Sequence, residues 1–176
     1  MVFRLESIAK IESARQIYAD LDETHAYTQT TNNILDDPNL LEAVESVLEP
    51  YVNFAENYVW RSGIADVIGV YRDAFVNAGM WGNRNIPGKR ITTTIKYGYL
   101  GSVIYVEDEG NGFDYLAQIN KLESGGRHDY QNNGGGMRKF FRSPLHIAYH
   151  GNGNKISIAT RVFSEDDITH FSKRLK

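Results

Sequence analysis

A short acidic segment that contains two glycines places the strongest constraint on how this chain folds. Residues 102–106 are mostly apolar and β-branched, as a buried strand requires, and Asp108, Gly110 and Gly112 follow with the spacing D-x-G-x-G. A carboxylate therefore stands at a strand end, where glycines let the chain turn and let a ligand approach the backbone. Such a carboxylate can accept a hydrogen bond from a purine amino group. Asp and Gly also form ordinary turns, so this segment alone leaves a plain turn open.

A predicted helix upstream carries a second pair of polar residues. Apolar residues recur at helical spacing from Ile64 to Val76. Asp73 and Asn77 are four residues apart, so they share one face of that helix. Their oxygens suit Mg²⁺, which usually binds through one or two side chains together with phosphate oxygens. The alternative is a solvated pair on an exposed face.

A glycine-rich segment lies downstream. Gly134, Gly135 and Gly136 lead into Met137 and a stretch with helical potential that includes Lys139. A glycine turn that opens a helix offers free N–H groups and the positive end of the helix dipole, both of which suit phosphate. The alternative is a flexible surface loop, which glycine runs also form.

In this order, the three segments resemble the nucleotide-binding boxes of the GHKL ATPases, which share the Bergerat fold. The resemblance covers residues 38–163 and is greatest to the anti-sigma-factor serine kinases, whose first box ends much like residues 77–83. Asp73 stands where that branch usually has Glu, and Ser143 stands where it usually has Asp. The resemblance implies an α+β two-layer sandwich, with a mixed, mainly antiparallel sheet and helices on one face.

The resemblance also implies ATP and Mg²⁺ as ligands. Asp108 would accept from the adenine amino group, Asn77 would hold Mg²⁺, and Asp73 would orient or deprotonate a hydroxyl group as general base. The other residues that it assigns to the nucleotide are Gly110, Gly112, Phe113, Gly134, Gly135, Gly136, Met137 and Lys139. The implied activity is that of an ATP-dependent protein serine/threonine kinase, with a phosphorylatable antagonist protein and a sigma factor as partners. Two alternatives stay open: a nucleotide-dependent binding switch without turnover, and a detached histidine-kinase-type catalytic domain.

The chain divides into residues 1–33, an N-terminal helix with a connecting segment, and residues 34–176, the ATP-binding domain. An apolar stripe over residues 5–21 needs a surface to cover it, either this domain's own or that of a second copy in a homodimer. Residues 24–33 are polar, and either an edge strand or a loop fits them. We expect a strand over residues 90–97, a mobile lid over 114–133, and a hairpin over 145–160 that turns at 151–154.

Composition limits the remaining classes. The formal net charge of −3 argues against a general nucleic-acid binder, whose surface is basic. The chain has no cysteine, which excludes disulfides and thiolate metal sites. No apolar run approaches the roughly 20 residues of a membrane-spanning helix, and the N-terminus lacks a signal-peptide core. We therefore expect a soluble, cytoplasmic protein.

Overall fold

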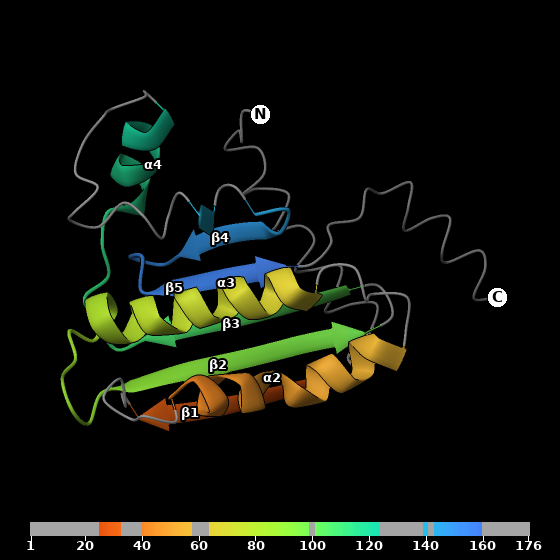
Figure 1. Cartoon of the computed structure of the whole chain (residues 1–176). Coiled ribbons are helices and arrows are strands. Elements are labelled where there is room, and N and C mark those ends of the chain that lie inside the picture. Colours follow the sequence, from red (N-terminus) through yellow and green to blue (C-terminus); the bar gives the residue numbers. More distant parts are fainter. Residues whose placement is uncertain are drawn as a thin grey trace.

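The computed structural model describes residues 25–32, 40–57, 64–98, 101–123, 139–140 and 143–159. Within them the elements, in chain order, are β1 (His25–Asn32), α2 (Leu40–Asn57), α3 (Ile64–Asn77), the π-helical turn η2 (Ala78–Gly82), β2 (Arg90–Gly98), β3 (Gly101–Asp108), α4 (Tyr115–Glu123), β4 (His146–His150) and β5 (Lys155–Ala159) (Figure 1). None of the helices in this described part is both long and apolar enough to cross a bilayer.

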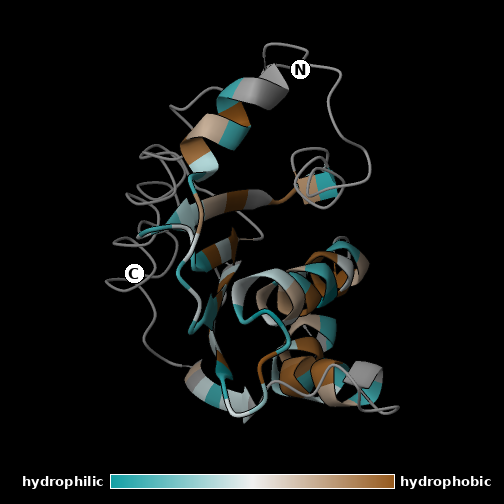
Figure 2. Ribbon diagram, turned by 90° about the vertical axis from the view of Figure 1, so that its left-hand side faces the viewer, coloured by the Kyte–Doolittle hydropathy of each residue, from teal (hydrophilic) through white to brown (hydrophobic). Residues whose placement is uncertain are grey.

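The strands form a five-stranded sheet in the order β1-β2-β3-β5-β4. Every pairing among the described residues is antiparallel, so the parallel component of the expected mixed sheet is not found there. Helices α2 and α3 pack side by side against one face of the sheet (Figure 2). The expected α+β class is therefore confirmed for the described residues, and α2 and α3 take the expected place on one face of the sheet (Figure 2).

The core lies between these two layers because strand and helix periodicities point apolar side chains toward each other. One continuous cluster joins alternate residues of the central strands to the inner faces of α2 and α3. Its fully buried members include Val44, Val47, Leu48, Val67, Tyr71, Phe75, Ile91, Ile95, Ile104, Val106 and Ile158. The buried hydroxyl of Tyr71 is paired with Oγ1 of Thr93 at 3.0 Å, which fastens α3 to β2.

Several predicted elements are confirmed. The polar segment before residue 33 forms β1, an edge strand of the described sheet, rather than a loop. The strand over 90–97 and the hairpin with its turn at 151–154 are also present. Pro50 lies inside α2 and does not divide it. The N-terminal helix expected over residues 5–21 lies outside the described residues.

The segment that follows Asp114 differs from the prediction. The polar composition predicted a mobile lid and indicated no helix there, but helix α4 begins at Tyr115. Oδ1 of Asp114 accepts a hydrogen bond from the backbone N–H of Ala117 at 2.9 Å, which caps the first turn of this helix. The carboxylate that ends a glycine-rich turn therefore also starts a helix. In Figure 1, α4 lies away from α2 and α3, beyond the β4 side of the sheet.

Candidate functional site

One continuous helical element carries most of the candidate site. Helix α3 ends at Asn77 and runs directly into η2, where the N–H of Asn83 donates to the carbonyl of Ala78 at 2.7 Å. Asp73 and Asn77 are both half-buried and, four residues apart, lie on one face of α3. Wide π turns of this kind occur frequently at functional sites. The element ends beside β3, which η2 contacts.

The carboxyl group of Asp108 lies against the end of that element. Asp108 is the last residue of β3, is 9% exposed, and accepts a hydrogen bond at Oδ1 from the N–H of Gly110 at 2.8 Å. A Cβ atom at Gly82 would overlap this carboxyl group, and a Cβ atom at Gly110 would overlap the Gly82 carbonyl. Both positions therefore need glycine, and the close contact brings the D-x-G-x-G turn against η2.

Burial raises the pKa of the Asp108 carboxyl, and the charge of Glu107 raises it further. The N–H of Gly110 and the ammonium of Lys89 act in the opposite direction, but burial is the larger effect. Burial removes hydrating water from the ionised carboxylate, so any further hydrogen-bond donor that reaches it stabilises its charge. An amino group on a ligand can supply such a donor, because it carries N–H groups that a carboxylate oxygen accepts.

The second glycine of the motif rests on the hairpin turn between β4 and β5. Gly112 has φ of +71°, and a Cβ atom there would overlap the Asn152 carbonyl. That carbonyl accepts from the N–H of Phe113 at 2.8 Å, and Nδ2 of Asn152 donates to the carbonyl of Asn111 at 2.8 Å. The D-x-G-x-G turn is thus held between η2 on one side and the hairpin turn on the other.

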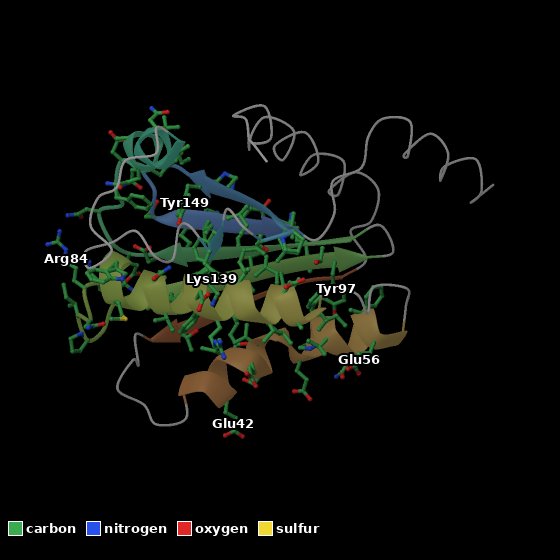
Figure 3. The ribbon with its side chains drawn as sticks, turned by 45° about the horizontal axis from the view of Figure 1, so that its top comes forward. Glu42, Glu56, Arg84, Tyr97, Lys139 and Tyr149 are labelled. Carbon is green, nitrogen blue, oxygen red and sulfur yellow. The ribbon has the colours of Figure 1, made fainter. Side chains whose placement is uncertain are left out.

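An aromatic cluster joins this turn to α4. The ring of Phe113 meets that of Tyr149 edge-on at 5.1 Å, and Tyr115 stacks on Tyr149 at 5.7 Å with an interplanar angle of 26°. Burial strongly raises the pKa of the Tyr149 hydroxyl. Figure 3 shows Tyr149 on the β4 side of the sheet, toward α4. The first turn of α4 is therefore anchored on β4, while Phe113 itself remains 39% exposed.

Lys139 lies at the other end of the site and forms an ion pair with Oδ2 of Asp73. This oxygen is enclosed and has no hydrogen-bond partner among the described residues, so the ion pair is the contact that the structure gives it. Figure 3 shows Lys139 above the middle of α3. The segment that follows the glycine-rich stretch thus reaches the same face of α3 as the predicted general base.

The structure places the predicted residues in two groups. Asp73, Asn77 and Lys139 lie on or beside α3, while Asp108, Gly110, Gly112 and Phe113 surround the end of β3. Gly134, Gly135, Gly136 and Met137 lie outside the described residues. Gly82, Asn83, Asn152 and Asn154 carried no predicted site role. Gly82 and Asn83 end the first box, and Asn152 and Asn154 lie in the predicted hairpin turn.

A metal ion at the candidate site would find few side-chain ligands. Among the described residues, no group of three or more His, Asp or Glu side chains could hold one. The carboxamide of Asn77 makes no side-chain capping bond at the start of η2, and it lies one turn from Asp73. This set fits Mg²⁺ that takes most of its ligands from phosphate and water, and it does not fit a metal held by protein alone.

No protein-family model matches the chain, and no curated protein matches its sequence. Any function proposed for the site therefore rests on its own residues and on the order of its motifs.

Gly82→Ala should destabilise the fold, because the added methyl group overlaps the Asp108 carboxyl. We expect a loss of about 1–3 kcal/mol in the free energy of unfolding, measured by denaturant titration. Gly69→Ala is the matched control on α3, since nothing lies within 4 Å of a Cβ atom there. It should stabilise the helix by roughly 0.5–1 kcal/mol. Equal effects of the two substitutions would contradict the contact.

The pH dependence of stability should differ between the wild type and Asp108→Asn. Because the folded pKa of Asp108 is raised above its usual value of 3.8, the folded state binds this proton more tightly than the unfolded chain does. The contribution of Asp108 to stability is therefore greatest at low pH and declines as the pH rises through the folded pKa. The free energy of unfolding of the variant relative to wild type should increase through that window and level off above it. A difference that does not vary with pH would contradict the raised pKa.

Proposed function

We propose that this protein binds ATP with Mg²⁺ and transfers the γ-phosphoryl group to a serine or threonine hydroxyl of a partner protein, as GHKL kinases of the anti-sigma-factor type do. The observation that carries the proposal is the Asp108 carboxyl, which is buried at a strand end and enclosed by Gly82 and Gly110. Gly82 belongs to the same helical element as Asp73 and Asn77. The continuous element α3–η2 therefore runs from Gly82, beside the proposed acceptor for adenine, to Asn77 and Asp73, where the phosphates would lie.

The length of this element supports a nucleotide lying along it. Asp73 and Gly82 are nine residues apart, which corresponds to about 13 Å at the helical rise of 1.5 Å per residue. An adenine ring at Asp108 would therefore direct its phosphates toward Asn77, Asp73 and Lys139. Gly112 would shape the turn beside the ring, because its left-handed backbone lets the Asn152 carbonyl pack where a Cβ atom would stand. Bound Mg²⁺ would neutralise phosphate charge, and Asn77 is the side chain that would hold it.

The transfer itself asks mainly for positioning and charge. A bond forms between the partner's hydroxyl oxygen and the γ-phosphorus, and the bond from that phosphorus to the β–γ bridging oxygen breaks, releasing ADP. The hydroxyl proton passes to the carboxylate of Asp73, which must lie within hydrogen-bond reach of it. Lys139, which pairs with Asp73 in this structure, would turn its charge to the γ-phosphate.

The Asp73–Lys139 ion pair also favours a second candidate, a nucleotide-dependent binding switch without turnover. A carboxylate that keeps its lysine partner is held by that contact and is not free to turn toward a hydroxyl group. In that case ATP would rearrange the pair and change the surface around it, and no phosphoryl group would move. The two candidates share the nucleotide site and differ only in the fate of the γ-phosphate.

The nucleotide site is tested by comparing ATP with ITP, whose base carries a carbonyl oxygen where adenine carries its amino group. Wild-type protein with Mg²⁺ should bind ATP at least about tenfold more tightly, since ITP would leave a buried acceptor without its donor. Asp108→Asn should lose this preference, and Asp66→Asn, which changes an exposed aspartate at the start of α3, should keep it. Calorimetric titration gives both constants. If wild-type protein binds the two nucleotides equally, or neither, the adenine assignment is wrong.

Label from γ-labelled ATP then separates the activities. With Mg²⁺ and cell extract, a kinase should place acid-stable label on serine or threonine of a partner protein, whereas a histidine-kinase-type domain would give acid-labile label. Asp73→Asn should abolish transfer by the kinase but leave ATP affinity within about threefold, a difference of roughly 0.6 kcal/mol. Tight ATP binding without transfer to any protein would identify the switch.

A further inference from the structure

Asn83 is a fully buried polar side chain beside the site. It is 0% exposed and uses both ends of its carboxamide. Its Nδ2 donates to the carbonyl of Arg90 at 3.0 Å, and its Oδ1 accepts from the N–H of Glu109 at 3.0 Å. A buried amide with both ends paired ties its partners firmly, because breaking either bond leaves a polar group without water. Asn83 thus links the end of η2 to the start of β2 and to the turn after β3.

The group that Asn83 holds is the peptide unit between Asp108 and Glu109. Its N–H points to Asn83, and its carbonyl accepts from Nδ2 of Asn154 at 3.2 Å. The backbone N–H of Asp108 donates in turn to the Asn154 carbonyl at 3.0 Å. This peptide unit is therefore hydrogen-bonded on two sides, by Asn83 after η2 and by Asn154 in the turn between β4 and β5. The plane of the peptide sets the direction in which the Asp108 side chain leaves the backbone.

A second set of contacts reaches the same turn from outside. The carboxylate of Glu109 accepts from the backbone N–H of Arg90 at 3.0 Å and from its Nε at 2.9 Å, which lowers the pKa of Glu109. The two side chains of this pair are 60% and 42% exposed. Exposed ion pairs contribute little to stability. The buried hydrogen bonds of Asn83 therefore do more than the Arg90–Glu109 pair to fix the orientation of the turn after β3.

We propose that Asn83 is a positioning residue for adenine recognition, which acts by fixing the Asp108–Glu109 peptide so that the Asp108 carboxylate faces the exocyclic amino group of the base. The inference rests on the proposed nucleotide function. Gly82 and Asn83 have complementary tasks in it. The glycine gives the carboxyl group room, and the asparagine next to it holds the backbone from which that carboxyl group extends.

The test is the ratio of ATP affinity to ITP affinity in Asn83→Ala, measured by calorimetric titration with Mg²⁺. We expect this ratio to fall about tenfold, chiefly through weaker ATP binding, because a misdirected acceptor loses its hydrogen bond to the amino group. The ratio should not change when Asn83→Ala is added to Asp108→Asn, since Asn83 acts through Asp108. If Asn83 had only a structural role, Asn83→Ala would instead weaken the binding of ATP and ITP equally and leave the ratio unchanged.

Two further variants complete the test. Asn53→Ala, an exposed asparagine on α2, is the matched control and should leave the ratio unchanged. Asn83→Asp keeps an acceptor for the N–H of Glu109 and removes the donor to Arg90, so its ratio should fall by less than that of Asn83→Ala. The inference is overturned if the folded alanine variant keeps the wild-type ratio, or if neither Asn83 variant folds. If wild-type protein itself does not bind ATP more tightly than ITP, the proposed nucleotide function is wrong, whatever the Asn83 variants show.

Discussion

The contact between the Asp108 carboxyl group and two glycine backbones is the constraint on which the rest of the site depends. A charged group this deeply enclosed is costly unless its surroundings supply donors, and the described structure offers the N–H of Gly110 at Oδ1. Glycine at position 82 also lets η2 lie close to the end of β3, because a Cβ atom there would overlap the Asp108 carboxyl group. The helix that carries Asp73 and Asn77 is thereby fixed relative to the end of the sheet.

The support for this contact comes from segments that are far apart in the sequence. Asn83 approaches from η2, and Asn152 and Asn154 approach from the turn between β4 and β5. Asparagine suits these places because one carboxamide both donates and accepts, and can therefore satisfy backbone groups that a turn leaves unpaired. Aromatic packing of Phe113 and Tyr115 on Tyr149 then connects the same turn to α4.

Local sequence predicted the elements of this site better than it predicted their contacts. The strand before Asp108, the helix that carries Asp73 and Asn77, and the hairpin near the end of the chain follow from periodicity and turn residues, which act over a few neighbours. Helix α4 was missed because its cap, Asp114, lies in a segment whose polar composition favoured a loop. The roles of Gly82 and Asn83 could not be predicted, because they arise from contacts with residues about 26 positions away. The assignments at Gly134 to Met137 stay predictions, since those residues are not among the described ones.

The π-helical turn η2 determines the direction, around the helix axis, in which Gly82 points. An α-helix advances by about 100° per residue, so one residue more or less rotates everything beyond it by that angle. The wide turn between Ala78 and Asn83 behaves as one extra residue in the last turn of the element that begins with α3. Removing a single residue from it would let a plain α-helix form and would swing Gly82 away from Asp108. The spacing of residues within η2 therefore matters as much as their identity, and length variation is tolerated less here than in an ordinary surface loop.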